Sequence, residues 1–157
     1  ALEHISSVYE QNRLVSQLFS AQMEQTGEAA QKMLDALAAE KLRSAALQKQ
    51  VFASIAKDYA GQKNVLHFAE NLDSAQLREL SDAIANSVTG FAAVFSGSDG
   101  RYGFCITARE GDLRQLVRDM TQALQGRGGG KANMQQGSVH ATRTQVQAFL
   151  DRQYLAE

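Results

Sequence analysis

The stretch GFAAVFSGSDGRYGFCITAR, residues 90–109, decides the fold of this chain. Two runs rich in aromatic and β-branched residues stand on either side of SGSDG, residues 96–100. Two such runs, separated by a few small and turn-forming residues, are typical of a β-hairpin. The stretch therefore predicts two antiparallel strands, around which the rest of the chain has to pack.

The residues before the hairpin predict a strand followed by a helix. NVLHFAE, residues 64–70, reads as a short strand. Asp73 and Gln76 form an Asp-x-x-Gln capping box, which is typical of a helix N-terminus. The helix that follows carries one apolar face, formed by Leu77, Leu80 and Ile84.

The residues after the hairpin predict a helix, a second short strand and a final helix. Asp112 and Gln115 form another capping box, and Gly126 is expected to end that helix in the left-handed conformation. A glycine-rich loop and a strand at 136–141 follow, and Thr142 to Gln145 start the last helix. The apolar residues of these two helices are Leu113, Leu116, Val117, Met120 and Leu124, then Val146, Phe149 and Leu150.

The first 62 residues predict a helical arm. Apolar residues recur at three- and four-residue steps in two runs, which a break at Thr26 and Gly27 separates. The second run follows a heptad pattern suited to one partner helix, at Ala38, Leu42, Ala45, Lys49, Phe52, Ala56 and Tyr59. One interpretation is a helical hairpin whose two helices bury each other. The other is a coiled coil that dimerises the chain, and the two interpretations are compatible.

Together these elements predict an α+β fold with two domains. Residues 1–62 form the helical hairpin or coiled-coil arm, with a homodimer through this arm as an expected assembly. Residues 63–157 form a small α/β domain with a mixed sheet flanked by helices. The sequence starts without Met and already in a helical pattern, so we expect it to be part of a longer protein.

The composition restricts the classes of function. The formal net charge of the 157 residues is −1, so a surface for nucleic acid has to be local. Cys105 is the single cysteine and cannot form an internal disulfide, which favours a reducing, cytoplasmic location. No apolar run approaches the roughly 20 residues of a membrane-spanning helix, so no membrane partner is expected.

The segment GRGGGKANMQQGSVH, residues 126–140, differs in composition from the rest of the chain. A flexible linker is one interpretation, but a linker joins two domains and little more than one helix follows this segment. A nucleotide-binding loop is excluded, because Lys131 is followed by Ala132 instead of Ser or Thr and because a helix precedes the segment.

The remaining interpretation is a contact for phosphate and RNA. Glycines let a backbone approach a phosphate closely and present successive N–H groups as a nest. No acidic residue occurs between Met120 and Leu150, which makes this part of the chain locally basic. The residues expected to contact nucleic acid are Arg127, Gly128, Gly129, Gly130, Lys131, Asn133, Gln135, Gln136 and Arg143.

The block GRGGGKANMQQG resembles the end of the C-terminal domain of alanyl-tRNA synthetases and of alanyl-tRNA editing proteins. In that family a glycine run is followed by a basic residue, Asp or Asn, Met, and Gln-Gly. The module is the DHH-associated C-terminal domain, which DHH-type phosphoesterases share. Two departures are notable: Ala132 stands where the synthetases commonly have Pro, and Lys131 stands where phosphoesterases carry His. The second departure argues against the phosphoesterase branch.

The resemblance implies a module that holds tRNA, with tRNA-Ala as the expected partner, for a separate catalytic domain. It implies that the parent protein is a zinc-dependent aminoacyl-tRNA hydrolase or, as the alternative, an alanyl-tRNA ligase. His4, His67 and His140 are too far apart to form the zinc-binding pairs of the editing proteins, so no catalytic residue, metal or cofactor is expected in this chain. The competing hypothesis is a dimerisation or assembly module that makes no contact with RNA.

Overall fold

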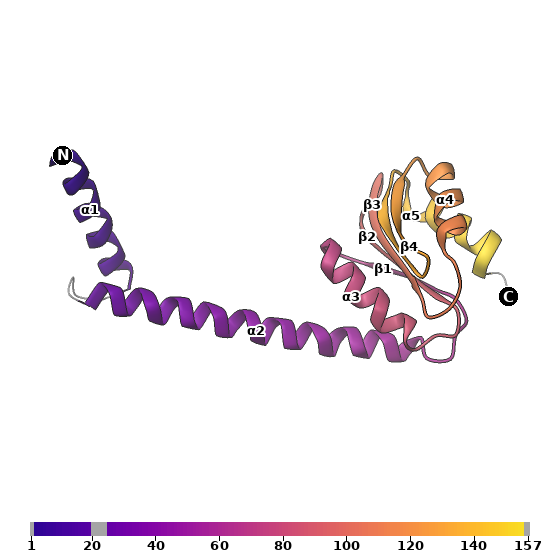
Figure 1. Ribbon diagram of the computed structural model, residues 1–157, viewed down its shortest axis with the longest axis horizontal. Helices are drawn as coiled ribbons and strands as arrows, with labels where there is room; N and C mark the ends of the chain where they lie inside the picture. Colours follow the sequence, from indigo (N-terminus) through magenta and orange to yellow (C-terminus); the bar gives the residue numbers. More distant parts are fainter. Residues whose placement is uncertain (1, 20–24, 156–157) are drawn as a thin grey trace. The chain divides into compact units, whose positions relative to one another are not determined.

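The computed structural model describes residues 2–19 and 25–155 (Figure 1). The chain forms two compact units that divide between Gln48 and Lys49. This division lies inside helix α2 (Thr26–Asp58), because the last turns of α2 bury Phe52 and Ala56 in the core of the second unit. Helix α2 ends at Asp58, shortly before residue 62, where the sequence analysis set the boundary between the arm and the α/β domain.

The first unit contains helix α1 (Leu2–Leu18) and the start of α2. The hydroxyl oxygens of Ser16 and Thr26 lie 2.6 Å apart, and Ser16 is the buried residue of α1. The apolar side chains of the described arm remain largely exposed, and Leu42 reaches 73% exposure. The apolar faces of the two arm helices are therefore exposed among the residues that the structure describes.

The heptad positions of α2 divide into two groups with different surroundings. Ala38, Leu42 and Ala45 are exposed. Phe52 and Ala56 are buried, and Tyr59 packs beside them on the core of the second unit. The last part of the expected helix–helix seam is therefore occupied by the α/β domain. A helical pattern along one chain does not distinguish between these two kinds of partner.

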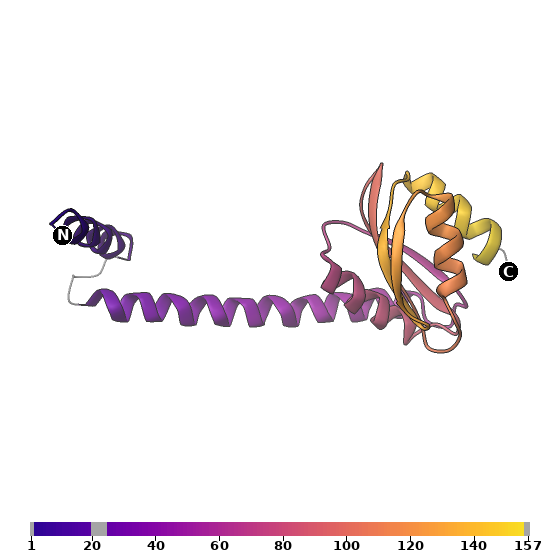
Figure 2. The same cartoon turned by 45° about the horizontal axis from the view of Figure 1, so that its top comes forward.

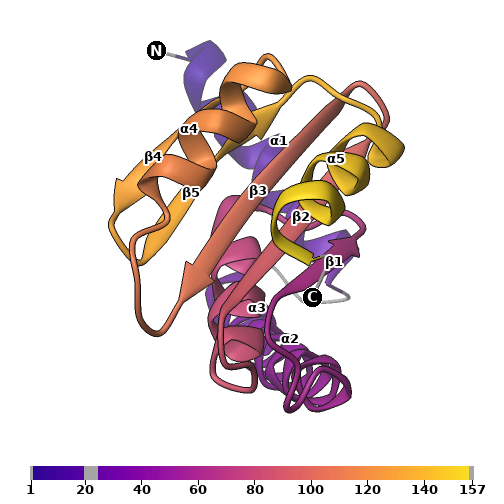
Figure 3. The same ribbon diagram turned by 90° about the vertical axis from the view of Figure 1, so that its right-hand side faces the viewer.

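The second unit is built on a five-stranded sheet (Figure 3). The sheet is mixed, as the sequence predicted, but one of its strands, β4, lies where the sequence predicted a loop. The strand order is β1-β2-β3-β5-β4, with β1 parallel to β2 and the other neighbours antiparallel. The strands span Val65–Ala69 (β1), Phe91–Ser98 (β2), Arg101–Ala108 (β3), Arg127–Lys131 (β4) and Met134–Val139 (β5). β1 and β4 are therefore the two edges.

Helices cover both faces of the sheet (Figures 1 and 2). Helix α3 (Ser74–Ala85) and the end of α2 pack against one face, around Leu80 and Ile84. Helices α4 (Arg114–Ala123) and α5 (Arg143–Leu150) pack against the other, and a π-helical turn (Asp151–Leu155) follows α5. The result is the α+β architecture expected from the order of the elements.

The predicted hairpin turn, the Asp73 capping box and the helix start at Thr142 are present. The β2–β3 hairpin turns at Asp99 and Gly100, between the paired residues Ser98 and Arg101. Asp73 caps α3 through the backbone N–H of Gln76, and Thr142 caps α5 in the same way. Both capping boxes have their reciprocal bond, so these helix starts are determined by residues that are close in the sequence.

The two ends of α4 differ from the prediction. The Asp112 carboxylate accepts hydrogen bonds from the backbone and side chain of Arg114, so it does not cap the helix through Gln115. At the other end the left-handed residue is Gln125, with φ 50°, and Gly126 donates its N–H to the Thr121 carbonyl. Gly126 is needed for packing, because a Cβ there would lie 2.8 Å from the Val139 side chain.

Candidate nucleic-acid interface

The glycine segment is a strand and not a loop. Arg127–Lys131 forms β4, which pairs with β5 across the two-residue turn at Ala132 and Asn133. β5 begins at Met134, two residues earlier than expected. Because backbone N–H groups alternate in direction along a strand, the glycines cannot present successive N–H groups as a nest. The expected anion nest is therefore wrong.

At most of these positions the surrounding atoms leave no room for a side chain, so glycine is required. A Cβ at Gly128 would lie 2.8 Å from the Phe104 ring and 3.1 Å from Val117 on α4. A Cβ at Gly130 would collide with the backbone of Met134. Gly129 is different, because no atom lies within 4 Å of the position that its Cβ would take. The fold requires two of the three glycines and leaves open space at the third.

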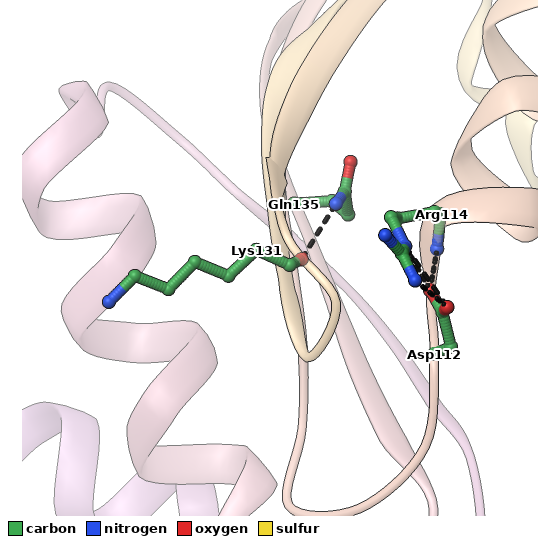
Figure 4. A network of polar contacts seen from close by, with 4 residues as sticks. All are labelled: Asp112, Arg114, Lys131 and Gln135. Atoms are coloured by element: carbon green, nitrogen blue, oxygen red, sulfur yellow. Dashed lines mark hydrogen bonds and ion pairs between the residues drawn. The ribbon is translucent and has the colours of Figure 1, made fainter.

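Gly129 shares one face of β4 with two cations. Side chains alternate along a strand, so Arg127, Gly129 and Lys131 point to the same side. Figure 4 shows Lys131 pointing away from Gln135 and from the Asp112–Arg114 pair, which lie on the other side. The face belongs to a groove of about 540 Å³ beside α3, called here the α3 groove, lined by Ser74, Leu77, Gly103, Phe104, Arg127, Gly128, Gly129, Gln136, Gly137 and Ser138.

The charges of β4 are available to a ligand. Every residue of the strand is exposed. Within the described part of the chain neither Arg127 nor Lys131 forms an ion pair. Their Cα atoms are four residues apart, about 13 Å along an extended strand. Two uncompensated cations at that spacing, with open space between them at Gly129, can each meet a separate phosphate of one chain.

The amide side chains are less available than the sequence suggested. Gln135 is only 3% exposed, and its Nε2 donates to the Lys131 carbonyl at 2.7 Å. Gln136 lies in the α3 groove, where its Nε2 donates to the Ser74 carbonyl at 3.1 Å. Asn133 is exposed at the turn. Gln135 is therefore a structural residue of the hairpin, whereas Asn133 and the side-chain oxygen of Gln136 remain available to a ligand.

Arg143 lies away from the glycine strand. Its guanidinium carbon lies 4.6 Å from the centre of the Phe68 ring on β1. β1 and β4 are opposite edges of the sheet, separated by four interstrand steps, or about 19 Å. The structure therefore does not bring Arg143 together with Arg127 and Lys131, although all three stand close in the sequence.

A protein-family model for the DHHA1 domain matches residues 48–153, about two thirds of the chain. The chain belongs to the DHHA1 domain family. The resemblance found in the sequence is thereby confirmed, and the matched residues correspond closely to the second compact unit.

Two solved structures resemble this DHHA1 protein. The C-Ala domain from Aquifex aeolicus alanyl-tRNA synthetase is 21% identical, with a TM-score of 0.49, and the match covers 59% of this chain and 92% of that one. RecJ from Thermus thermophilus, in complex with Mg²⁺, is 14% identical, also with a TM-score of 0.49. That match covers 89% of this chain but only 28% of RecJ. No curated protein matches the chain.

The DHHA1 domain carries a second groove that the sequence analysis missed. This α4 groove, of about 270 Å³, lies on the other face of β4 and is lined by Arg114, Val117, Arg118, Thr121, Gly128, Gly129, Gly130 and Gln135. The Arg114 guanidinium lies 2.5 Å from the Asp112 carboxylate and holds the pKa of Asp112 at about 2. The four-residue spacing of Arg114 and Arg118 was visible in the sequence, but their position beside β4 was not.

Two potentially reactive side chains of the DHHA1 protein, Cys105 and His67, are buried or partly buried in the fold. Cys105 is buried, and burial raises the pKa of its thiol. Burial, together with Arg143, lowers the pKa of His67, whose Nδ1 lies 2.9 Å from the Tyr59 hydroxyl. The described residues include no cluster of three or more His, Cys, Asp or Glu that could hold a metal ion. None of the helices in the described ranges is long and apolar enough to span a membrane.

Proposed function

We propose that this chain is a nucleic-acid-binding module that holds tRNA through the edge strand β4. One observation carries the proposal: β4 is exposed along its whole length and places two cations, Arg127 and Lys131, on one face, neither of them in an ion pair with any described residue. Phosphate contacts of this kind supply most of the affinity of proteins for nucleic acid and position the ligand.

The α3 groove supports the proposal with further contacts. Open space at Gly129 allows a phosphodiester chain to approach the backbone between the two cations. The Gln136 side chain lies across from Gly129 in the sheet, where its oxygen can accept from a ribose hydroxyl. Asn133 at the turn extends the polar surface beyond Lys131. Affinity comes from the cations, and the amides add contacts to sugars or bases.

The identity of the ligand and of the parent protein rests on the resemblance of the glycine block to alanyl-tRNA proteins. We propose tRNA, with tRNA-Ala as the natural partner, and a separate domain that acts on the aminoacylated end. That domain is a zinc-dependent aminoacyl-tRNA hydrolase, or alternatively an alanyl-tRNA ligase. We propose a cytoplasmic location for the protein, which the single cysteine, Cys105, also favours.

Binding to unfractionated tRNA over a salt series tests the proposal. The wild-type chain is expected to bind with a negative slope of log K against log salt, and R127A/K131A is expected to lose affinity and about two units of slope. K57A/R152A removes the same charge away from both grooves and serves as the matched control. If both double variants bind like the wild type, or if the wild type does not bind at low salt, the proposal is wrong.

A second candidate function, an assembly module, is favoured by the apolar surface of the arm. All the large hydrophobic residues that the structure describes as exposed lie between Leu2 and Val51, in α1 and α2 and at Phe19. Surfaces of this kind on helices usually meet a partner. Sedimentation equilibrium of the full chain, beside L34E/L37E, tests self-association through the arm. A wild-type chain that stays monomeric excludes the homodimer.

A further inference from the structure

Helix α4 presents cations to the opposite face of β4. Arg114, Arg118 and Thr121 stand four and then three residues apart, so they share one side of the helix. That side lines the α4 groove together with the backbone of residues 128–130. The two faces of the same glycine strand therefore each carry two basic side chains.

Acidic neighbours cancel only part of the positive charge in the α4 groove. Asp112 forms its ion pair with Arg114. The Asp119 carboxylate accepts a hydrogen bond from Gln115 at 2.8 Å, and Asp119 does not line the groove. Arg118 is exposed and forms no ion pair with any residue that the structure describes. The excess positive charge of the groove is therefore that of Arg118.

Asp112 orders the groove as well as reducing its charge. Its carboxylate accepts bonds from Nε of Arg114 at 2.9 and 3.0 Å and from the Arg114 backbone N–H at 2.9 Å. A guanidinium held by several such bonds loses little further freedom when it meets a ligand. Asp112 thus restrains the Arg114 guanidinium, which lines the groove beside the exposed charge of Arg118.

We propose that Arg118, with Arg114 beside it, forms a second phosphate contact on the face of β4 opposite Arg127 and Lys131. The inference rests on the proposed function, because it assigns both faces of the strand to one nucleic-acid chain that lies over the exposed edge of the sheet. Glycines at 128–130 add no side chain on either face, so a phosphodiester backbone can come close to this edge. Figure 4 shows Arg114 and Lys131 on opposite sides of the β4–β5 hairpin, as this arrangement requires.

Binding of R118A to unfractionated tRNA over the same salt series tests the second contact. The variant is expected to bind several-fold more weakly than the wild type, with a salt slope smaller by about one unit. R118K keeps the positive charge, so its log K against log salt is expected to have the same slope as that of the wild type. R152A, an exposed arginine outside both grooves, is the matched control and is expected to bind like the wild type. Thermal unfolding of R118A checks that the exposed substitution leaves the fold intact.

The outcomes separate the inference from the proposed function. In one outcome the wild type binds tRNA, R127A/K131A loses binding, and R118A binds like the wild type. The α4 groove is then not a nucleic-acid contact, and the proposed function stands. If R118A and R152A lose slope equally, the effect is one of general charge and the inference is also overturned. If the wild type does not bind tRNA at all, the proposed function fails and the inference fails with it.

Discussion

The Gln135 side chain donates a hydrogen bond from Nε2 to the backbone carbonyl of Lys131, at 2.7 Å (Figure 4). The bond spans the two-residue turn between β4 and β5 and lies on the side of the hairpin that Lys131 does not face. Gln135 is almost fully buried, so its amide depends on this partner. The bond therefore holds the end of β4 from which the Lys131 side chain extends.

Gln135→Ala is expected to lower the free energy of unfolding by about 1–2 kcal/mol, because a buried hydrogen bond and its packing are lost. Hydrogen exchange of the β4 amides should become faster. Gln136→Ala is the control, since Gln136 is only half-buried, and its effect on stability should be smaller. Urea denaturation measures both variants, and equal losses would contradict a special role for the Gln135 bond.

Gly128→Ala and Gly129→Val are expected to separate packing from binding. A Cβ at Gly128 meets Phe104 and Val117, so Gly128→Ala should destabilise the fold by about 1–3 kcal/mol. At Gly129 the space is open and a β-branched residue suits a strand, so Gly129→Val should leave stability unchanged or slightly higher. Gly129→Val should nevertheless weaken tRNA binding. Unimpaired binding by this variant would exclude Gly129 as the point of approach.

The carboxyl group of Asp112 is expected to titrate with a pKa of about 2 in the folded protein, because Arg114 stabilises its charged form. In Arg114→Gln its pKa should return toward the ordinary value of about 3.9. NMR titration of the side-chain carboxyl carbon measures both values. A titration of Asp112 near the ordinary value in the wild type would show that the Arg114 contact is not formed in solution.

The stability of the domain is expected to fall as the pH drops below the ordinary histidine pKa of about 6.5. Burial and, less strongly, Arg143 lower the pKa of His67, so the folded state binds its proton less readily than the unfolded state. The contribution of neutral His67 to the stability of the fold is therefore complete above the pKa of His67 in the unfolded chain. It is lost as the pH falls toward the lower pKa of His67 in the folded protein. Urea denaturation at about pH 7.5 and about pH 5.5, on either side of that ordinary value, should show a smaller pH effect in His67→Asn. If the wild type and His67→Asn lose stability equally, the pH dependence comes from titratable groups other than His67.

Much of the fold could be predicted because its determinants are close in the sequence. The turn at Asp99 and Gly100 and the capping boxes at Asp73 and Thr142 each depend on residues at most a few positions apart. The capping box predicted at Asp112 does not form, because Arg114, which is closer in the sequence than Gln115, donates to the Asp112 carboxylate instead. Local chemistry predicts an element well only where one local partner dominates.

The candidate site was predictable in its residue types but not in its geometry. The acid-free stretch and the glycine block identified Arg127 and Lys131, yet the segment was expected to be a loop. Gly128 is explained by Phe104 and Val117, which belong to other elements and reach it only in the folded domain. No pattern within residues 126–140 contains that information.

The sequence by itself determined the helices, every strand except β4, the order of these elements and the basic character of the C-terminal region, since these depend on periodicity, capping and composition. Only the tertiary structure decided which residues share a surface. The strand order β1-β2-β3-β5-β4 puts the glycine strand at an edge and carries Arg143 to the opposite edge. The packing of α4 brings Arg118 beside that strand. Sheet order and helix docking are set by the burial of apolar faces over the whole domain, so they determine the neighbours of each charged side chain.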